Sequence, residues 1–125
     1  MVIGGGCTGL QASWILAKRG YDITVYEKSN YLGGLLYYAG IPKGKEGFHQ
    51  EIQTLKALCQ ENRVNIHLNY EVNEKNINNI EADLFIIAIG STPIIPNIKG
   101  IKEDSITAQE VLAGNINLHD KKIAI

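Results

Sequence analysis

The sequence is poor in the features that mark several classes of protein. It has two cysteines, Cys7 and Cys59, which lie far apart and have no C-x-x-C partner, so neither a disulfide framework nor disulfide-reductase chemistry is indicated. The formal net charge of −1 provides no basic field for nucleic acid and no cationic face for a membrane. No run approaches the roughly eighteen apolar residues that span a bilayer. We therefore expect neither nucleic acid nor a membrane as a partner.

The two ends of the sequence lack a leader segment and complete terminal strands. No charged-then-apolar leader begins the sequence, which favours a cytoplasmic location. The 125 residues suffice for one modest domain. Only Met1-Val2-Ile3 precedes the first glycine turn, and Lys121–Ile125 has the pattern of a strand that stops in mid-course. We expect a piece of a longer chain, incomplete at both ends.

Glycine, by contrast, is concentrated near the N-terminus. Gly4, Gly6 and Gly9 follow a short apolar strand and fit the G-x-G-x-x-G spacing that holds a dinucleotide pyrophosphate. The first glycine allows the sharp turn, the second lets the backbone approach the phosphates, and the third packs the helix on the sheet. The pyrophosphate then lies against free N–H groups at the helix N-terminus. The alternative is a turn that needs glycine only for its conformation.

The residues after this turn have the expected order. A helix predicted over residues 8–19 ends at Lys18-Arg19-Gly20, and an alternating strand over residues 21–27 ends in Glu27, eighteen residues after Gly9. An acidic residue about twenty positions on accepts hydrogen bonds from the adenosine ribose. A solvated glutamate is the alternative. We predict an α/β, Rossmann-like dinucleotide-binding domain, with a mainly parallel sheet flanked by helices.

Several nearby residues are further candidates for ligand contact. Thr8 either caps the first helix or gives its hydroxyl to a phosphate, while Cys7 contributes its backbone N–H or, alternatively, a reactive thiol. A long connection over residues 28–45 contains Gly33-Gly34, which permits close approach of backbone to ligand. Two lysines near the end of this connection, Lys43 and Lys45, either reach a phosphate or are solvated.

The remaining elements follow from periodicity and capping. Residues 46–61 have helical spacing, and residues 64–68 alternate as a strand. The apolar run 83–90 predicts a parallel strand covered on both faces, ending where small residues can meet a ligand. We further expect a short helix capped by Asn73 that runs to about Ile80, an extended segment 94–100, and a helix that begins with the capping box 107–110 and ends at Gly114.

Together these motifs resemble the flavoproteins with two dinucleotide-binding domains. The chain is most similar to the nucleotide-binding portion of the group of 2,4-dienoyl-CoA reductase, enoate reductase and trimethylamine dehydrogenase, also described as NADH:flavin oxidoreductases of the old yellow enzyme type. The resemblance covers nearly the whole chain and is carried by GGGCTGL, VYEKSNYLGGLL, the GKEGF of residues 44–48, IIAIGSTP and the PNIKG of residues 96–100.

The resemblance implies that the first glycine motif binds the ADP half of FAD and that Glu27 holds the ribose diol. It places Gly33, Gly34 and Leu35 near the flavin side of the pyrophosphate, and Val72 against adenine through its backbone. The full set of implied cofactor-binding residues is Gly4, Gly6, Cys7, Thr8, Gly9, Glu27, Lys28, Gly33, Gly34, Leu35, Lys45, Val72, Ala88, Ile89 and Gly90. Two departures from the family pattern, Cys7-Thr8 in place of Pro-Ala and Ile89 in place of Thr, affect mainly backbone positions.

The resemblance also implies the remainder of the protein. Residues 1–120 would be the first portion of the FAD domain, and residues 121–125 would begin an NAD(P)H domain. The parent chain would pass hydride from NAD(P)H to FAD, with a barrel carrying FMN and an iron–sulfur centre as a candidate further part. We assign no catalytic residue and no metal ligand here. The alternatives are an ADP- or NAD(H)-binding module without flavin chemistry and an interaction domain without ligand. Separately, exposed strand edges lead us to expect that part of the isolated chain forms a homodimer.

Overall fold

The computed structural model describes residues 1–101, 105–114 and 116–123. It divides into two compact units, Met1–Ser91 and Thr92–Ile125. The first unit contains a four-stranded sheet in the order β3-β2-β1-β4, and all its pairings are parallel. The expected α/β, Rossmann-like fold with a parallel sheet is therefore confirmed. The strands are β1 (Val2–Ile3), β2 (Thr24–Tyr26), β3 (Asn65–His67) and β4 (Ile86–Ile87).

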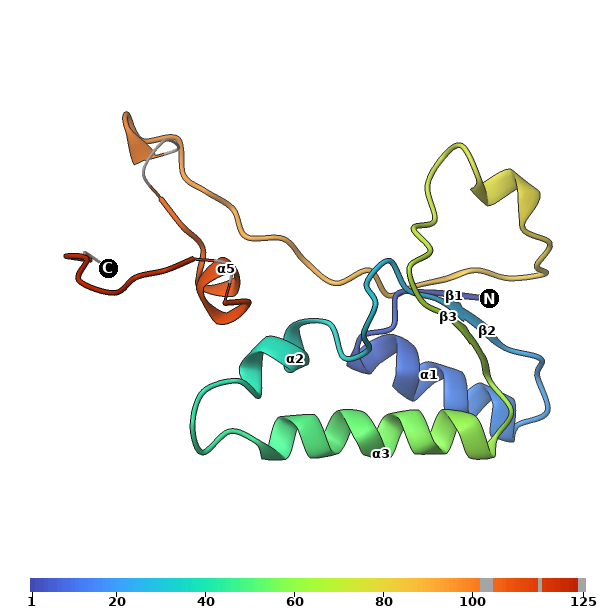
Figure 1. The fold of residues 1–125 in the computed structure, drawn as a ribbon. Coiled ribbons are helices and arrows are strands. Elements are labelled where there is room, and N and C mark those ends of the chain that lie inside the picture. The colour runs from blue at the N-terminus through green and yellow to red at the C-terminus, as the bar shows by residue number, and fades with distance from the viewer. Residues whose placement is uncertain (102–104, 115, 124–125) are drawn as a thin grey trace. The chain divides into compact units, whose positions relative to one another are not determined.

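The helices of the first unit pack on one face of this sheet. Helix α1 (Cys7–Lys18) follows β1, and α3 (Gly47–Glu61) lies beside it under the strands (Figure 1). Alternation in the strands turns Val2 and Val25 toward the helices, where both are fully buried. From α3 the buried residues are those at helical spacing, as predicted, namely Ile52, Leu55 and Cys59.

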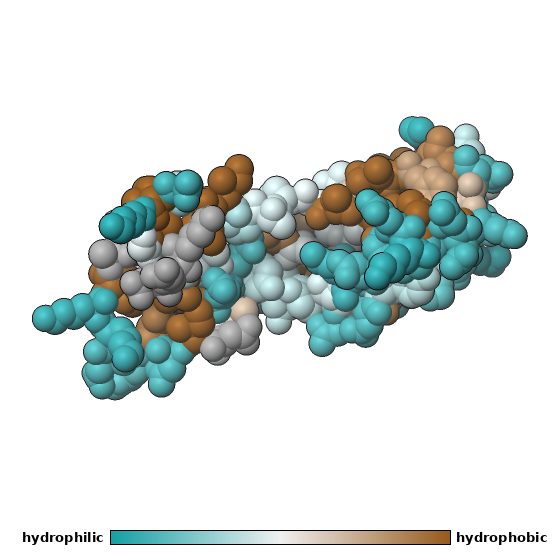
Figure 2. Space-filling model, turned by 90° about the horizontal axis from the view of Figure 1, so that it is seen from above, coloured by the Kyte–Doolittle hydropathy of each residue, from teal (hydrophilic) through white to brown (hydrophobic). Residues whose placement is uncertain are grey.

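The opposite face of the sheet is open at β4, which corrects the expectation for residues 83–90. Regular pairing makes only Ile86–Ile87 a strand, and the side chain of Ile87 is 71 % exposed while Ile86 is half-buried. An apolar run predicts that its side chains are buried, but it does not identify the helices or other elements that cover them. The α-helices α1, α2 and α3 lie on the other side of the sheet (Figure 1), and the view from above in Figure 2 shows apolar side chains at the surface.

The long connection over residues 28–45 contains a short helix that the sequence did not predict. Helix α2 (Leu35–Ala39) begins after Gly34 and ends at Gly40. Tertiary contacts between aromatic residues stabilise it. The rings of Tyr31 and Tyr37 lie 4.3 Å apart, and the hydroxyls of Tyr31 and Tyr38 are 2.7 Å apart. The five residues of this helix are too few for a helical periodicity to be recognised in the sequence.

The helix expected from Asn73 to Ile80 is also wrong. The structure has a 3-10 turn, η1 (Ile77–Asn79), instead. The side chain of Asn73 accepts a hydrogen bond from the N–H of Lys75 at 2.9 Å, while its own N–H donates to Asn76 Oδ1 at 2.8 Å. The carbonyl of Asn73 also accepts from the N–H groups of Asn76 at 3.2 Å and Ile77 at 3.0 Å, so Asn73 caps a turn as expected, but the turn continues only as η1.

A helix of the second unit begins at the predicted capping box. Helix α5 (Ala108–Leu112) carries a capping box in which Thr107 Oγ1 accepts from the N–H of Glu110 at 3.3 Å and Glu110 Oε2 accepts from the N–H of Thr107 at 2.7 Å. A hydrogen bond from the Thr107 hydroxyl and one from its backbone lower the pKa of Glu110. The cap therefore holds this carboxylate in its charged form.

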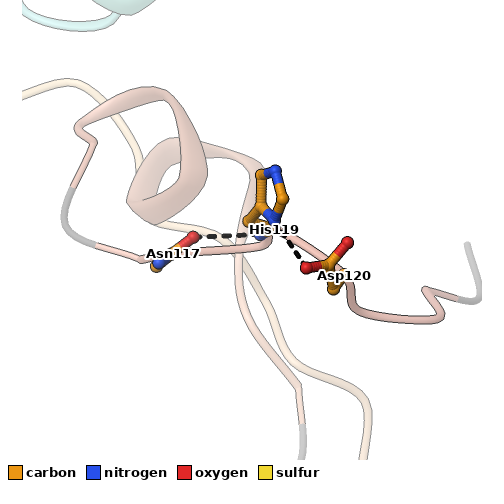
Figure 3. A network of polar contacts seen from close by, with 3 residues as sticks. All are labelled: Asn117, His119 and Asp120. Atoms are coloured by element: carbon orange, nitrogen blue, oxygen red, sulfur yellow. Dashed lines mark hydrogen bonds and ion pairs between the residues drawn. The ribbon is translucent and has the colours of Figure 1, made fainter.

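A polar cluster follows in the same unit. His119 Nδ1 lies 2.8 Å from Asp120 Oδ2, and Asn117 Oδ1 accepts from the N–H of His119 at 3.0 Å (Figure 3). Both members of the pair are more than four-fifths exposed, so the contact contributes little to stability. Residues 121–123 form no strand, and Ala124 and Ile125, the end of the strand expected there, lie outside the described residues. No helix in the described ranges is long and apolar enough to cross a bilayer.

Candidate functional site

Two of the three motif glycines are required by packing. Gly4 has φ +106°, and a Cβ on it would collide with the carbonyl oxygen of Ala88. A Cβ on Gly9 would collide with the carbonyl oxygen of Gly4. The turn therefore lies in close contact with both the end of β4 and the first turn of α1. These are the tight-turn and helix-packing roles that the spacing predicts.

Gly6 is different. Its φ of −74° and ψ of 179° suit any residue, and apart from its chain neighbours no atom of the described residues lies within 4 Å of the position of a Cβ. Neither backbone conformation nor packing explains a glycine here. The open space lies beside the start of α1, where a dinucleotide pyrophosphate is held in a Rossmann-like fold. A glycine at this position thus fits a ligand whose phosphate occupies the space that a side chain would otherwise fill.

The first turn of α1 leaves donors free toward this space. Among the described residues, the backbone N–H groups of Thr8 and Gly9 donate to no protein acceptor. Gly6 provides no side-chain cap, the first turn contains no acidic residue, and the exposed Thr8 does not cap the helix. Free N–H groups and the helix dipole together favour an anion.

The thiol of Cys7 is not activated by its position at the helix start. It is partly buried, and its Sγ lies 3.9 Å from the carbonyl oxygen of Gly33. Burial raises the pKa of Cys7 and outweighs the backbone hydrogen bond that lowers it. The reactive-thiol alternative is therefore disfavoured, and the contribution of Cys7 to a site is its backbone.

Glu27 is buried at the carboxyl end of β2, with 7 % of its surface exposed. Its Oε2 accepts from the N–H of Gly5 at 2.6 Å, and its Oε1 accepts from the N–H of Ser29 at 2.8 Å. The solvated glutamate considered as an alternative does not fit this environment. The sequence did not single out Gly5 or Ser29, because only the folded turn brings these donors to the carboxylate. Lys28 is exposed beside it.

The double glycine lies directly against the first glycine turn. Gly33 pairs with Gly6 in a parallel bridge, and its N–H donates to the carbonyl of Gly5 at 2.8 Å. Gly33 has φ +106°, and a Cβ on it would collide with the side chain of Ile52. Gly34 has φ +54°, and a Cβ on it would lie 3.3 Å from the Cα of Gly6. Leu35 follows at the start of α2, about half-exposed.

Three further candidates lie at the end of β4. Ala88 contacts the first turn through its carbonyl, and its N–H donates to the carbonyl of Ile3 at 2.8 Å. Ile89 is 70 % exposed, and Gly90 has φ +73°. In a parallel sheet the ends of β1, β2 and β4 lie at one edge, so the structure brings the glycine turn, Glu27 and Ala88 together there.

Two candidates are not joined to this group by a described contact. Lys45 is exposed in the turn before α3, with its ammonium 5.9 Å from the centre of the Phe48 ring. Val72 is half-buried, two residues beyond Tyr70, whose N–H donates to the carbonyl of Glu27 at 2.9 Å. Val72 thus follows closely after a residue that is hydrogen-bonded to Glu27, whereas no described contact connects Lys45 with the group.

A hollow of about 790 Å³ lies elsewhere in the first unit, between α3 and the β3 edge. Its lining contains none of the residues proposed from the sequence, and it has no free helix N-terminus, so we do not assign the nucleotide to it. Among the described residues, no group of three or more His, Cys, Asp or Glu side chains could hold a metal ion. The residues suited to an anionic dinucleotide are those at the carboxyl edge of the sheet.

The fold and this edge define a Rossmann-like nucleotide-binding protein. A profile of the family described as pyridine nucleotide-disulphide oxidoreductase matches residues 1–125. The chain belongs to this family of oxidoreductases, whose members use a flavin and a pyridine nucleotide.

Relatives and solved structures agree. The chain is 31 % identical over its whole length to cinnamate reductase of Clostridium sporogenes and covers 19 % of it. It is 32 % identical to NADH oxidase of Thermoanaerobacter brockii, again over the whole chain and 20 % of the relative. A structure of 2-naphthoyl-CoA reductase with 2-naphthoyl-CoA matches 95 % of the chain and 18 % of its own length, with a TM-score of 0.89 and 28 % identity. The resemblance drawn from the sequence is confirmed, and the chain spans about a fifth of these relatives.

Proposed function

We propose that this chain binds the ADP half of FAD, as the first portion of the FAD domain of a flavin-dependent NAD(P)H oxidoreductase. The observation that carries the proposal is the open space at Gly6, since no contact or backbone angle among the described residues requires a glycine there. Free N–H groups at the start of α1 adjoin it. When bound, the flavin accepts hydride and passes electrons on, while the protein binds and orients it.

Each part of the edge has a role in this proposal. The N–H groups of Thr8 and Gly9 bind the pyrophosphate, and Gly6 leaves room for it. Glu27 lies where the ribose diol is expected. The backbone of Gly33 and Gly34 would approach the flavin side of the pyrophosphate, a role that the bridge between Gly6 and Gly33 supports. The roles of the other candidates remain those implied by the resemblance, and these are Cys7, Lys28, Leu35, Lys45, Val72, Ala88, Ile89 and Gly90.

The rest of the protein belongs to the same proposal. Residues 1–120 are the first part of the FAD domain, and residues 121–125 begin the NAD(P)H domain. The chain spans about a fifth of its relatives, so the returning part of the FAD domain, the hydride donor site and a barrel with FMN and an iron–sulfur centre would lie in the remaining sequence. We place the parent protein in the cytoplasm and expect residues 1–125 alone to lack turnover.

A second candidate is a module that binds ADP or NAD(H) without flavin chemistry. The groups favourable to a ligand in the first unit are those suited to an adenosine diphosphate, and an acidic residue after β2 serves NAD as well as FAD. The double glycine against the first turn favours FAD, because a simple NAD-binding domain needs no second glycine pair there.

The test is a visible absorption spectrum of the purified chain with and without FAD, together with calorimetric titration of ADP. Retained flavin absorbance after gel filtration supports the FAD assignment. ADP binding without flavin retention supports a half-site that needs further sequence to hold flavin. If neither ligand binds to the folded chain, the proposal fails for residues 1–125.

A further inference from the structure

The carboxylate of Glu27 joins two backbone segments that the sequence keeps apart. Oε2 accepts from the N–H of Gly5 in the glycine turn at 2.6 Å, and Oε1 accepts from the N–H of Ser29 beyond β2 at 2.8 Å. The backbone of Glu27 adds a third connection, since its N–H donates to the carbonyl of His67 at 2.9 Å and its carbonyl accepts from the N–H of Tyr70 at 2.9 Å. One buried residue is thus bonded to the glycine turn, the end of β2 and the connection after β3.

The contact with Gly5 concerns the part of the turn nearest the phosphate space. Gly5 lies between Gly4 and Gly6 and is buried. A Cβ on Gly5 would lie 3.1 Å from the Cβ of Glu27, so the glutamate side chain packs against this backbone as well as bonding to it. A hydrogen bond to a charged acceptor is stronger than a neutral one, and loss of the acceptor leaves a buried N–H unsatisfied.

We propose that Glu27 is a positioning residue for the phosphate-binding turn: it fixes the backbone of Gly4–Gly6 before a nucleotide arrives, and this role is separate from any bond to the ribose. The inference rests on the proposed nucleotide function of the same edge. A carboxylate that acted only on the ribose would matter only for nucleotides with ribose hydroxyls. A carboxylate that shapes the turn matters for every ligand whose phosphates use that turn.

The test compares ADP with 2′,3′-dideoxy-ADP, which has no ribose diol. Both are titrated calorimetrically into the unchanged chain, into Glu27→Gln and into Asp22→Asn, a control that removes an exposed carboxylate from the opposite end of β2. The glutamine is isosteric, but its NH₂ group must face one of the two backbone donors. We expect Glu27→Gln to weaken both nucleotides by about tenfold or more and Asp22→Asn to change neither. Unchanged binding of the dideoxy nucleotide to Glu27→Gln, with ADP alone weakened, would overturn the positioning role.

If no nucleotide binds to any of the chains, the proposed function fails but the positioning role of Glu27 is not yet decided. Amide hydrogen exchange of the chain without ligand then tests that role. The N–H of Gly5 should be protected in the unchanged chain and exchange about tenfold faster in Glu27→Gln, while that of Leu55 in α3 keeps its rate. Equal protection of Gly5 in both chains refutes the proposal. If Glu27→Gln does not fold, Glu27→Asp serves instead, because its shorter side chain retains the charge but not the reach to both donors.

Discussion

The carbonyl oxygen of Ala88 occupies the space in which a side chain at Gly4 would lie. These residues are far apart in sequence, yet they meet because β4 pairs with β1 in parallel and both strands end at the same edge. The first glycine of the motif is therefore a requirement of the fold. Its contribution to a ligand site is indirect, through the shape of the turn.

Replacement of this glycine should destabilise the chain strongly. Gly4→Ala places a Cβ against the backbone of Ala88 and forces a non-glycine residue to φ +106°. We expect a loss of about 2 kcal/mol or more in the free energy of unfolding, measured with urea, since such backbone strain costs about 1–3 kcal/mol and the collision adds to it. A Gly4→Ala chain as stable as the unchanged one would show that β4 does not pack on the turn as described.

Stability should also fall in alkaline solution because of Tyr31. Burial, followed by the hydrogen bond with Tyr38, raises the pKa of Tyr31 to about 12 from an ordinary value of 10.0. The folded chain thus favours the neutral phenol, so this contribution is complete below about pH 10 and is lost as the pH rises toward about 12. Urea unfolding across this range should show a weaker pH dependence in Tyr31→Phe. Tyr21→Phe is the control, since Tyr21 is 63 % exposed, and equal slopes for all chains would contradict the account.

The uncovered face of β4 should promote self-association of the isolated chain. Ile87 and Ile89 are 71 % and 70 % exposed, and β4 is an edge of the described sheet. Light scattering at increasing concentration should show dimer that decreases in Ile87→Lys. Ile94→Lys, at a residue 94 % exposed in the second unit, is the control and should not change it. A strictly monomeric chain at every concentration would refute this expectation.

The sequence predicted those parts of the first unit in which neighbouring residues carry the signal. The spacing of Gly4, Gly6 and Gly9 predicted the turn, and helical periodicity predicted α3 within one residue. Helix α2 depends on contacts of Tyr31 with Tyr37 and Tyr38, which no local pattern reveals. The same holds for the cover of β4, because an apolar run does not say what packs on it.

In the candidate site, too, the sequence predicted what local patterns carry and not what depends on tertiary contacts. The spacing predicted Glu27, since an acidic residue ends the second strand of such folds. Its bonds to Gly5 and Ser29 could not be predicted, because they depend on how closely the glycine turn approaches the end of β2. The contact of Gly33 with Gly6 was likewise expected only as proximity to a ligand, whereas the structure has the two backbones in direct contact.

The central claim, that a nucleotide phosphate occupies the space beside Gly6, is tested most directly by Gly6→Ala with Gly47→Ala as a matched control. Both positions have open space around a Cβ and no positive φ. Each alanine should therefore leave the free energy of unfolding unchanged or raise it by up to about 1 kcal/mol. We predict that calorimetry then finds ADP binding weakened at least about tenfold in Gly6→Ala and unchanged in Gly47→Ala. Only the methyl group added at residue 6 enters the phosphate space. A stable Gly6→Ala chain that binds ADP as tightly as the unchanged chain would contradict the claim.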